Sequence, residues 1–375
     1  MPDGVAGGGG PLFAGAAGRP SPSDPVTVAV VNWNGERYLD RCFEAIRAQT
    51  RRPENVWLVD NASTDGSVAR VRGAFPEVRV VPLAENRGPA PARNRALLDA
   101  PTRLVLLVDN DAELEDRTLE ELLRAMASGD GIAACQARAV HDGDWERIHY
   151  DGGRLTLVGL QSLRNAGRRA EELPATDADV AALQSVVLLV DRAQISAGDL
   201  FDEGYFFYFE DFDWSLRLRL RGKRCVAVAR AVARHRTGTK DLSYREGNPF
   251  PARRAHYFTR NHLRLVAKCF SARTLVLAMP AILLYESAWF LYLALRGHAR
   301  GFFTGLASFV RDRAEVKALR GAVQATRTVR DRELIEPVPL SLVTAGGSGG
   351  IAAVASSALS AVISLWARCV RPLLG

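Results

Sequence analysis

The chain has 375 residues, of which 47% are apolar and 24% are charged. This is the composition of an ordinary folded protein, which excludes a wholly disordered chain, and the length allows one large domain with a smaller one, or two domains. The formal net charge of +7 fits a partner rich in phosphate, which by composition alone could be nucleic acid, a nucleotide substrate or an anionic membrane.

Cysteine spacing and the first residues bear on the compartment. The five cysteines are scattered, with no two at metal-site or CxxC spacing, and an odd number without a framework indicates a reducing environment. Residues 1–25 are rich in Gly, Pro, Ala and Ser, and they lack a basic start followed by an apolar core. They predict a flexible tail and no secretory signal.

The first third of the chain predicts strands that alternate with helices. The run 26–31 is β-branched and apolar on both faces, as in a buried parallel strand. Further strands are expected at 55–59, 78–82 and 104–108, with helices after residue 35 and at about 90–98. This alternation predicts an α/β domain with a mostly parallel sheet.

Polar residues follow each of these four strands. In parallel sheets, ligands bind beyond the carboxyl ends of the strands. One Asp after a strand is commonly a helix cap or a turn former, but polar residues after all four strands indicate a binding crevice. They are Asn32, Asn34, Asp60, Asn86, Asp109 and Asp111.

The middle of the chain is less regular. A strand is predicted at 185–190 and another at 225–229, and the region around 165–179 reads as loop. Five aromatic residues at 205–209 run directly into Glu210 and Asp211. The segment 216–221 alternates Leu and Arg as a strand would, yet Gly222 follows it like a helix C-cap, so periodicity leaves helix and strand open.

Two apolar stretches lie in the last quarter of the chain. Residues 276–295 are nearly all apolar and close to the length that a spanning helix needs, and 351–366 form a second stretch. Basic residues flank the first, while Glu286 lies inside it. We expect membrane contact, either by spanning or by lying in the interface, and the alternative is a pair of buried core helices.

Asp109 and Asp111 are the first chemical candidates. In an extended chain, residues two apart point the same way, so both carboxylates can face one ligand. Hard oxygen ligands suit Mg²⁺ or Mn²⁺, with phosphate oxygens completing the shell. The tripeptide is common in surface turns, and its place after a buried strand is what makes it a candidate metal site.

Glu210 and Asp211 are the second candidates, and His235 is the third. A carboxylate in apolar surroundings has the raised proton affinity that a general base requires, although acidic residues at a helix start also complement the helix dipole. His235 lies between two arginines, which suits a nearby diphosphate. It could ligate a metal or be an ordinary surface residue.

Five segments in order resemble one known family: 28–35 (VAVVNWNG), 59–66 (VDNASTDG), 86–94 (NRGPAPARN), 108–111 (VDND) and 206–213 (FFYFEDFD). Together they are similar to the family 2 inverting glycosyltransferases with the GT-A fold, and within them to the rhamnosyltransferase-like branch. The resemblance covers about residues 26–267. One departure is the pair Pro89 and Pro91, where the family more often has small or aromatic residues.

The resemblance implies a role for each candidate. Asp60 and the region around Asn32 and Asn34 would bind the nucleobase and ribose of the donor, with Arg93 and Asp109 also touching the nucleotide. Asp111 would hold the metal, and His235 falls where some members have a metal-binding histidine. Asp211 would be the base that deprotonates the acceptor hydroxyl, with Glu210 beside it.

The resemblance also implies partners and a location. The donor would be a nucleotide sugar, dTDP-rhamnose by preference or a UDP-sugar, and the acceptor a lipid-linked or polysaccharide saccharide of the cell envelope. The protein would act at the cytoplasmic face of the cell membrane, peripherally or with one or two membrane segments. We expect a tail at 1–25, a GT-A domain at 26–270 and a helical, membrane-associated region at 271–375.

Three other function classes compete. A nicotinamide-dependent oxidoreductase needs a glycine-rich turn after the first strand, where this chain has Asn32-Trp33-Asn34-Gly35. A nucleotidyltransferase would show a glycine- and lysine-rich phosphate loop near the start, and this sequence has no such loop there. A non-catalytic membrane-bound scaffold need not keep the three aspartates 109, 111 and 211. No nucleic-acid partner is expected, since membrane and diphosphate account for the charge equally well.

Overall fold

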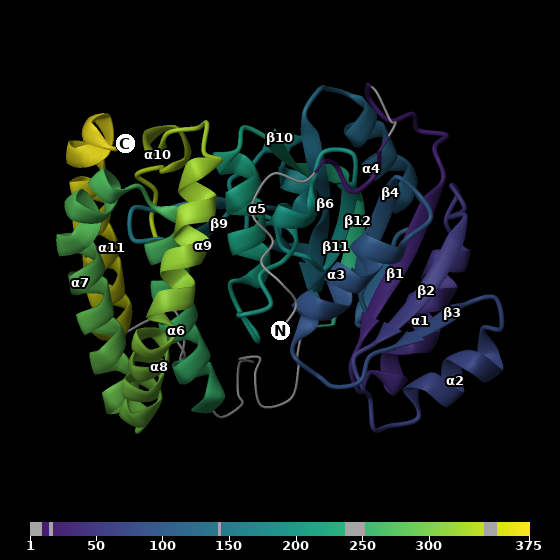
Figure 1. Ribbon diagram of the computed structural model, residues 1–375, viewed down its shortest axis with the longest axis horizontal. Helices are drawn as coiled ribbons and strands as arrows, with labels where there is room; N and C mark the ends of the chain where they lie inside the picture. Colours follow the sequence, from purple (N-terminus) through teal and green to yellow (C-terminus); the bar gives the residue numbers. More distant parts are fainter. Residues whose placement is uncertain (1–9, 15–17, 142–143, 237–251, 341–350) are drawn as a thin grey trace.

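The structure is a computed structural model that describes residues 10–14, 18–141, 144–236, 252–340 and 351–375. A large sheet with helices on both faces occupies one side of the molecule, and a group of long helices occupies the other (Figure 1).

Four parallel strands form one half of the sheet, in the spatial order β4, β1, β2, β3. The side chains of β1 and β4 are largely buried on both faces, as the apolar runs predict, whereas β3 at the edge is more exposed. Helices α1, α2 and α3 alternate with them. The bounds are β1 Val26–Asn32, α1 Glu36–Arg47, β2 Asn55–Asp60, α2 Ser67–Ala74, β3 Arg79–Pro82, α3 Pro89–Asp99 and β4 Leu104–Asp109.

The other half of the sheet mixes directions. β11 (Val187–Asp191) runs antiparallel between β4 and β6, and β6 (Ile132–His141) runs parallel to β12 (Arg224–His235). The other elements here are β5 Ala112–Leu114, α4 Thr118–Ala127, β7 Asp144–Tyr150, β10 Ala178–Asp179 and 3₁₀ turns at Ala170–Glu172 and Ala197–Asp199. β8 Gly153–Leu155 and β9 Gln161–Leu163 form a separate two-stranded sheet. The predicted α/β class with a mostly parallel central sheet is confirmed.

Helices cover both faces of the sheet. Leu39 and Phe43 of α1 pack with Leu122 of α4 in the core on one face. Leu97 of α3 packs with Trp214 of α5 (Glu210–Leu220) in the core on the other. The layered arrangement leaves the carboxyl ends of the parallel strands free at one edge of the sheet, and the polar strand-end residues gather there.

The alternating segment 216–221 lies in a helix. Leu216, Leu218 and Leu220 are all buried within α5, and Arg217 is buried against Asp213 at 2.8 Å one turn earlier. A helix that is buried on every side loses the one-sided pattern that marks amphipathic helices. Gly222 follows with φ of 78°, as the C-cap pattern predicts.

The last third of the chain is helical. Its helices are α6 Ala252–Cys269, α7 Ala272–Leu295, α8 Ala299–Arg311, α9 Arg313–Ala325, α10 Asp331–Leu334 and α11 Ile351–Val370, with a 3₁₀ turn at Arg371–Leu373. Their core includes Leu157 and Phe212 from the sheet-containing part together with Phe270, Ile282 and Ile335. The helical region therefore shares a core with the domain that precedes it.

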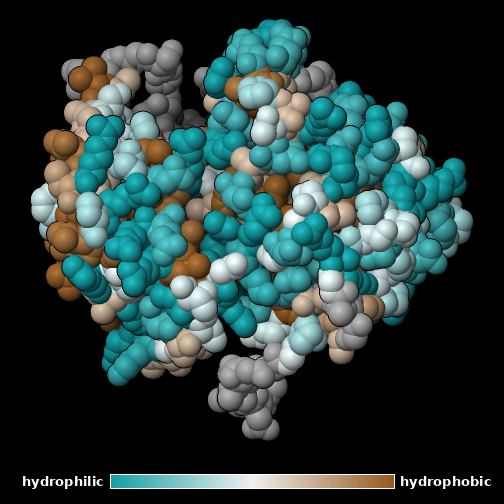
Figure 2. Space-filling model, turned by 90° about the horizontal axis from the view of Figure 1, so that it is seen from above, coloured by the Kyte–Doolittle hydropathy of each residue, from teal (hydrophilic) through white to brown (hydrophobic). Residues whose placement is uncertain are grey.

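Among the described residues, two helices are long and apolar enough to cross a membrane: Ala272–Leu295, with a mean hydropathy of 1.6, and Ala353–Leu373, with 1.5. Only 28% of each apolar window is buried. Apolar side chains are correspondingly exposed on α7, α8 and α11, and Figure 2 shows hydrophobic atoms along the left edge, the side on which α7 and α11 lie in Figure 1. Exposed examples are Val276, Leu283, Leu291, Phe303, Val354 and Leu365.

The predicted domain limits stay predictions. Within residues 10–25, Leu12 donates its amide to the carbonyl of Ile195 at 2.8 Å, and Arg19 pairs with Asp130 at 2.7 Å. Residues 1–9 and 15–17 of the predicted tail lie outside the described residues.

Candidate active site

Asn32 organises the carboxyl ends of β1 and β2. It is fully buried, and its Nδ2 donates to Asp60 Oδ1 at 2.7 Å and to Ser63 Oγ at 3.1 Å. Its Oδ1 accepts from Asn110 Nδ2 at 2.6 Å. Because Asn32 is the register partner of Asp60 across the two strands, the sheet holds these polar groups in one place.

Asn34 belongs to the same loop but faces a different partner. Its φ of 49° is in the left-handed region that Asn tolerates, and its Oδ1 accepts the amide of Thr64 at 2.8 Å. A Cβ at Gly35 would lie 1.9 Å from Asn110 Nδ2. The loop after β1 therefore packs directly against the Asp109–Asp111 turn.

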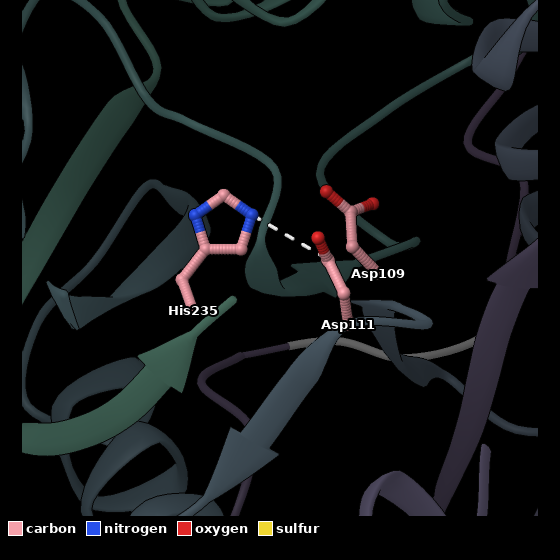
Figure 3. A group of neighbouring side chains, drawn as sticks. All are labelled: Asp109, Asp111 and His235. Carbon is pink, nitrogen blue, oxygen red and sulfur yellow. Dashed lines mark ion pairs between the residues drawn. The ribbon is translucent and has the colours of Figure 1, made fainter. Parts of the chain in front are cut away.

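Asp109, Asp111 and His235 form a candidate metal centre (Figure 3). One ligand atom from each lies within 4.8 Å of the others, and Nε2 of His235 is 3.4 Å from Asp111 Oδ1. The pairing of β5 with β12 brings His235 beside this turn, opposite Ala112. Two carboxylates and an imidazole are a donor set that fits Mn²⁺, and carboxylates with phosphate oxygens fit Mg²⁺.

Burial and mutual repulsion alter the titration of this group. Burial raises the pKa of Asp109, and the nearby Asp111 charge adds to this, while Arg93 opposes both. Burial alone would lower the pKa of His235, but the Asp111 and Asp109 carboxylates outweigh it and raise that pKa. A divalent cation held between these two close carboxylates would neutralise their charge.

Arg93 connects this centre to the second group of acids. Its Nη2 donates to Asp109 Oδ1 at 2.9 Å and its Nη1 donates to Glu210 Oε1 at 3.1 Å, and its side chain is 3% exposed. Burial raises the pKa of Asp211, and the Arg93 charge opposes that rise. The three acids predicted separately from the sequence thus lie in one electrostatic group around a buried guanidinium.

Glu210 and Asp211 begin helix α5 after a strained turn. Tyr208 and Phe209 both have φ of 69°, which is costly for aromatic residues, at roughly 1–3 kcal/mol each. Asp211 Oδ2 accepts the Ser185 amide at 3.3 Å, and its Oδ1 accepts the Phe212 amide at 2.7 Å. Burial raises the pKa of Asp211 and that of Glu210. Both carboxyls are at the helix start, as the dipole interpretation expects, and both have the raised proton affinity that a base requires.

The structure adds contact residues that are not among the sequence predictions. Ser63 could have been suspected from the turn-rich loop after β2, where it accepts from Asn32 and from the Asn34 amide. Ser185 and His149 come from segments far along the chain and reach Asp211 and His235 only through strand pairing.

Comparison with known proteins gives the family. Residues 27–181 match the model of glycosyl transferase family 2. The N-acetylglucosaminyl-diphospho-decaprenol L-rhamnosyltransferase of Mycobacterium tuberculosis is 28% identical over 235 residues, which are 57% of this chain and 76% of that protein.

Solved structures give the fold. The mannosyltransferase PcManGT of Pyrobaculum calidifontis, in complex with GDP-Man and Mn²⁺, aligns over 94% of this chain and 89% of its own with a TM-score of 0.50. GalNAc-T7 with UDP, GalNAc and Mn²⁺ aligns over 65% of this chain and 48% of its own, with a TM-score of 0.52. Both are 17% identical in sequence. The chain therefore contains a glycosyltransferase family 2 domain at residues 27–181 and has the GT-A fold.

Proposed function

We propose that this glycosyltransferase moves a hexosyl group, rhamnosyl by preference, from a nucleoside diphosphate sugar to a hydroxyl of a lipid-linked or cell-envelope saccharide, with inversion at the anomeric carbon. The observation that carries this proposal is the Arg93 bridge. Arg93 joins Asp109, a member of the candidate metal centre, to Glu210. Glu210 directly precedes Asp211, the carboxylate that we assign as the base.

In this mechanism Asp211 is the general base. The acceptor oxygen attacks the anomeric carbon, its proton passes to a carboxylate oxygen of Asp211, and the bond between that carbon and the diphosphate oxygen breaks. The two amides that donate to Asp211 orient the carboxylate without occupying all its lone pairs. Glu210 and the buried Arg93 hold the base and the nucleotide end of the site in fixed relation.

Charge develops on the departing diphosphate as the sugar leaves. A Mg²⁺ or Mn²⁺ ion held by Asp111, His235 and Asp109 would stabilise that charge when bound. We assign the nucleobase and ribose to the Asn32–Asp60 pair and its loop with Asn34, and further nucleotide contacts to Arg93 and Asp109. The M. tuberculosis relative, which is named as a rhamnosyltransferase, supports rhamnose as the first sugar to test and dTDP-rhamnose, ahead of a UDP-sugar, as the first donor.

A groove with a volume of about 430 Å³ carries aromatic and basic side chains, together with Glu203 and Asp312, which pair with Arg87 and Arg260. It lies between the loop after β3 and helices α6 and α8, and is lined by Arg87, Phe206, Tyr257, Arg260 and Arg311 among others. Phe206 and Tyr257 stack at 5.1 Å. We assign this groove to the sugar and phosphate of a lipid-linked acceptor, since aromatic faces suit sugars and guanidinium groups suit phosphate.

The exposed apolar helices support a membrane location for the enzyme. The outward faces of α7 and α11 are largely uncovered, with Val276 73% and Val354 71% exposed. At the cytoplasmic face of the cell membrane, the groove would have access to a lipid-linked acceptor. The helices would lie on the membrane or cross it.

The test is a panel of radiolabelled nucleotide sugars, incubated with the purified full chain, Mg²⁺ or Mn²⁺, and membrane lipid extract. We expect transfer of label into a lipid fraction, with dTDP-rhamnose the best donor. Transfer from another sugar would correct the donor alone. An absence of turnover with every donor and both metals would contradict the enzyme proposal and leave a sugar-nucleotide-binding scaffold.

A further inference from the structure

Three histidines lie on neighbouring strands behind the candidate metal centre. His235 at the end of β12 is the register partner of His141 on β6. β7 pairs with β6 on the other side, with Tyr150 opposite Ala139 and Ile148 opposite Val140, so His149 falls between these two pairings. The strands thus bring His149 beside His235, although 86 residues separate them.

The two rings meet through one specific atom pair. Nδ1 of His149 is 3.1 Å from Nδ1 of His235, and their planes differ by 19°. The other ring nitrogen of His235, Nε2, points to Asp111 at 3.4 Å (Figure 3). His235 therefore has one nitrogen directed at the candidate metal centre and the other engaged by His149.

This geometry decides which tautomer of His235 can bind a cation. A neutral imidazole carries one N–H and one lone pair, so Nε2 can ligate only when Nδ1 holds the proton. That proton needs an acceptor, and Nδ1 of a neutral His149 is the atom in position to supply it. Metal-ligating histidines generally donate their second N–H to a carboxylate, a carbonyl or a water. Here an uncharged ring fills that place, which adds no further negative charge beside two aspartates.

We propose that His149 is a positioning residue that accepts the Nδ1–H of His235 and so holds Nε2 free and oriented toward the metal. This rests on the metal site of the proposed function. The ring of His149 is itself held by packing, because its centroid lies 4.3 Å from that of His141 and 3.8 Å from that of Tyr150. A fixed acceptor restricts rotation of the ligand ring, and loss of such partners typically costs 10- to 100-fold in metal affinity.

The test measures Mn²⁺ binding to the purified full chain without sugar nucleotide, by electron paramagnetic resonance of free Mn²⁺. His149→Phe keeps a flat ring but has no acceptor, and we expect its Kd to rise about 10- to 100-fold. His149→Asn places an amide oxygen near the position of Nδ1 and should restore most of the affinity. His141→Phe keeps the packing ring and should bind as the wild type does.

Two further measurements separate positioning from folding. The melting temperature of each metal-free variant reports general damage, which would be shared by His149→Phe and His149→Asn. Nitrogen-15 spectra of labelled histidines, recorded at saturating Mg²⁺, report the tautomer of His235 when Nε2 ligates the cation. His235 should then carry its proton on Nδ1 in the wild type and lose that preference in His149→Phe.

The outcomes are distinct. Equal Mn²⁺ affinity in His149→Phe and the wild type, with clear weakening in His235→Ala and Asp111→Asn, overturns the role of His149 and leaves the metal site intact. Equal weakening in His149→Phe and His149→Asn overturns the acceptor role. If His235→Ala and Asp111→Asn also bind like the wild type, the metal site of the proposed function fails, and the role of His149 fails with it.

Discussion

Glu286, midway along the apolar helix α7, lies with its Oε1 2.6 Å from Nδ1 of His262 in α6. The other nitrogen of His262 lies 2.6 Å from the carbonyl oxygen of Val158, so it must donate there. The contact with Glu286 then needs a proton as well, held by the histidine or by the carboxyl group. The one acidic residue of this helix is thus turned toward the folded domain and away from the exposed apolar face.

Removing this carboxyl group should destabilise the domain. His262 is fully buried and Glu286 is 9% exposed, and breaking one side of a buried pair typically costs about 3–5 kcal/mol. We expect Glu286→Leu to lower the free energy of unfolding by that order in urea titrations with detergent present. Glu286→Gln, which can still hydrogen-bond, should lose less, and His262→Leu combined with Glu286→Leu should recover part of the loss. A Glu286→Leu protein as stable as the wild type would show that the Glu286–His262 contact does not stabilise the packing of α7 on α6.

The exposed apolar side chains of α7 should govern membrane binding. Leu283 is 59% exposed and Leu291 is 57% exposed, and a charge placed in the apolar region of a bilayer is costly, by roughly 2.5–3.5 kcal/mol at its centre. We expect Leu283→Glu with Leu291→Glu to weaken cosedimentation with anionic lipid vesicles at least about tenfold. Ala318→Glu on the exposed side of α9 is the matched control and should bind as before. Unchanged vesicle binding of the double variant would contradict the prediction that α7 contacts the membrane.

Local pattern predicted the parallel half of the fold well. The runs at 26–31 and 104–108 are apolar on both faces because both faces are buried, and they became β1 and β4 within one residue. The segment 216–221 could not be assigned, because a helix buried all round has no polar side to mark its period. β6 and β7 were not predicted as strands, since their pairing depends on distant partners.

In the candidate site, too, local pattern indicates single residues but not the contacts between distant segments. Asp109, Asp111, Asp211 and His235 could be selected from position and resemblance, and the structure groups Asp109 and Asp111 with His235. The bridge from Arg93 to Glu210 spans 117 residues of sequence, and no local rule predicts which arginine meets which acid. No local pattern marks His149, because its contact with His235 depends on the register of three strands.

Asp211 carries the largest expected catalytic effect. Asp211→Asn keeps the shape and the ability to accept the Ser185 amide but cannot take up a proton. We expect kcat for transfer to fall about 10²- to 10⁴-fold, the usual contribution of a general base. Donor affinity, measured by calorimetry with the nucleoside diphosphate, should stay near the wild-type value. Transfer at the wild-type rate would remove Asp211 from the mechanism.

Arg93 should not be replaceable by lysine. Its two contacts use separate nitrogens, Nη2 to Asp109 and Nη1 to Glu210, and a single ammonium group cannot reproduce that fork. We expect Arg93→Lys to lower kcat/KM by about 10²-fold, a typical cost of misplacing reacting groups by about 1 Å, while retaining the positive charge. Arg95→Lys, an exposed pair with Asp99 on the same helix, is the control. Similar activity in both variants would show that charge alone suffices at position 93.

The acid limb of the pH profile should report the carboxyl pair. Burial raises the pKa of Asp211 and that of Glu210, for which the adjacent Asp211 charge is a further cause, while Arg93 opposes both. Because the base must be ionised, kcat/KM should rise with pH through an apparent pKa above the ordinary carboxyl value of about 4. In Glu210→Gln the Arg93 charge is no longer shared with Glu210 and acts more strongly on Asp211, so the limb should move to lower pH. Initial rates of transfer from pH 4.5 to 8.5 at saturating Mn²⁺ measure this. If the acid limb stays in place or moves to higher pH, Glu210 does not raise the pKa of the base by sharing the Arg93 charge.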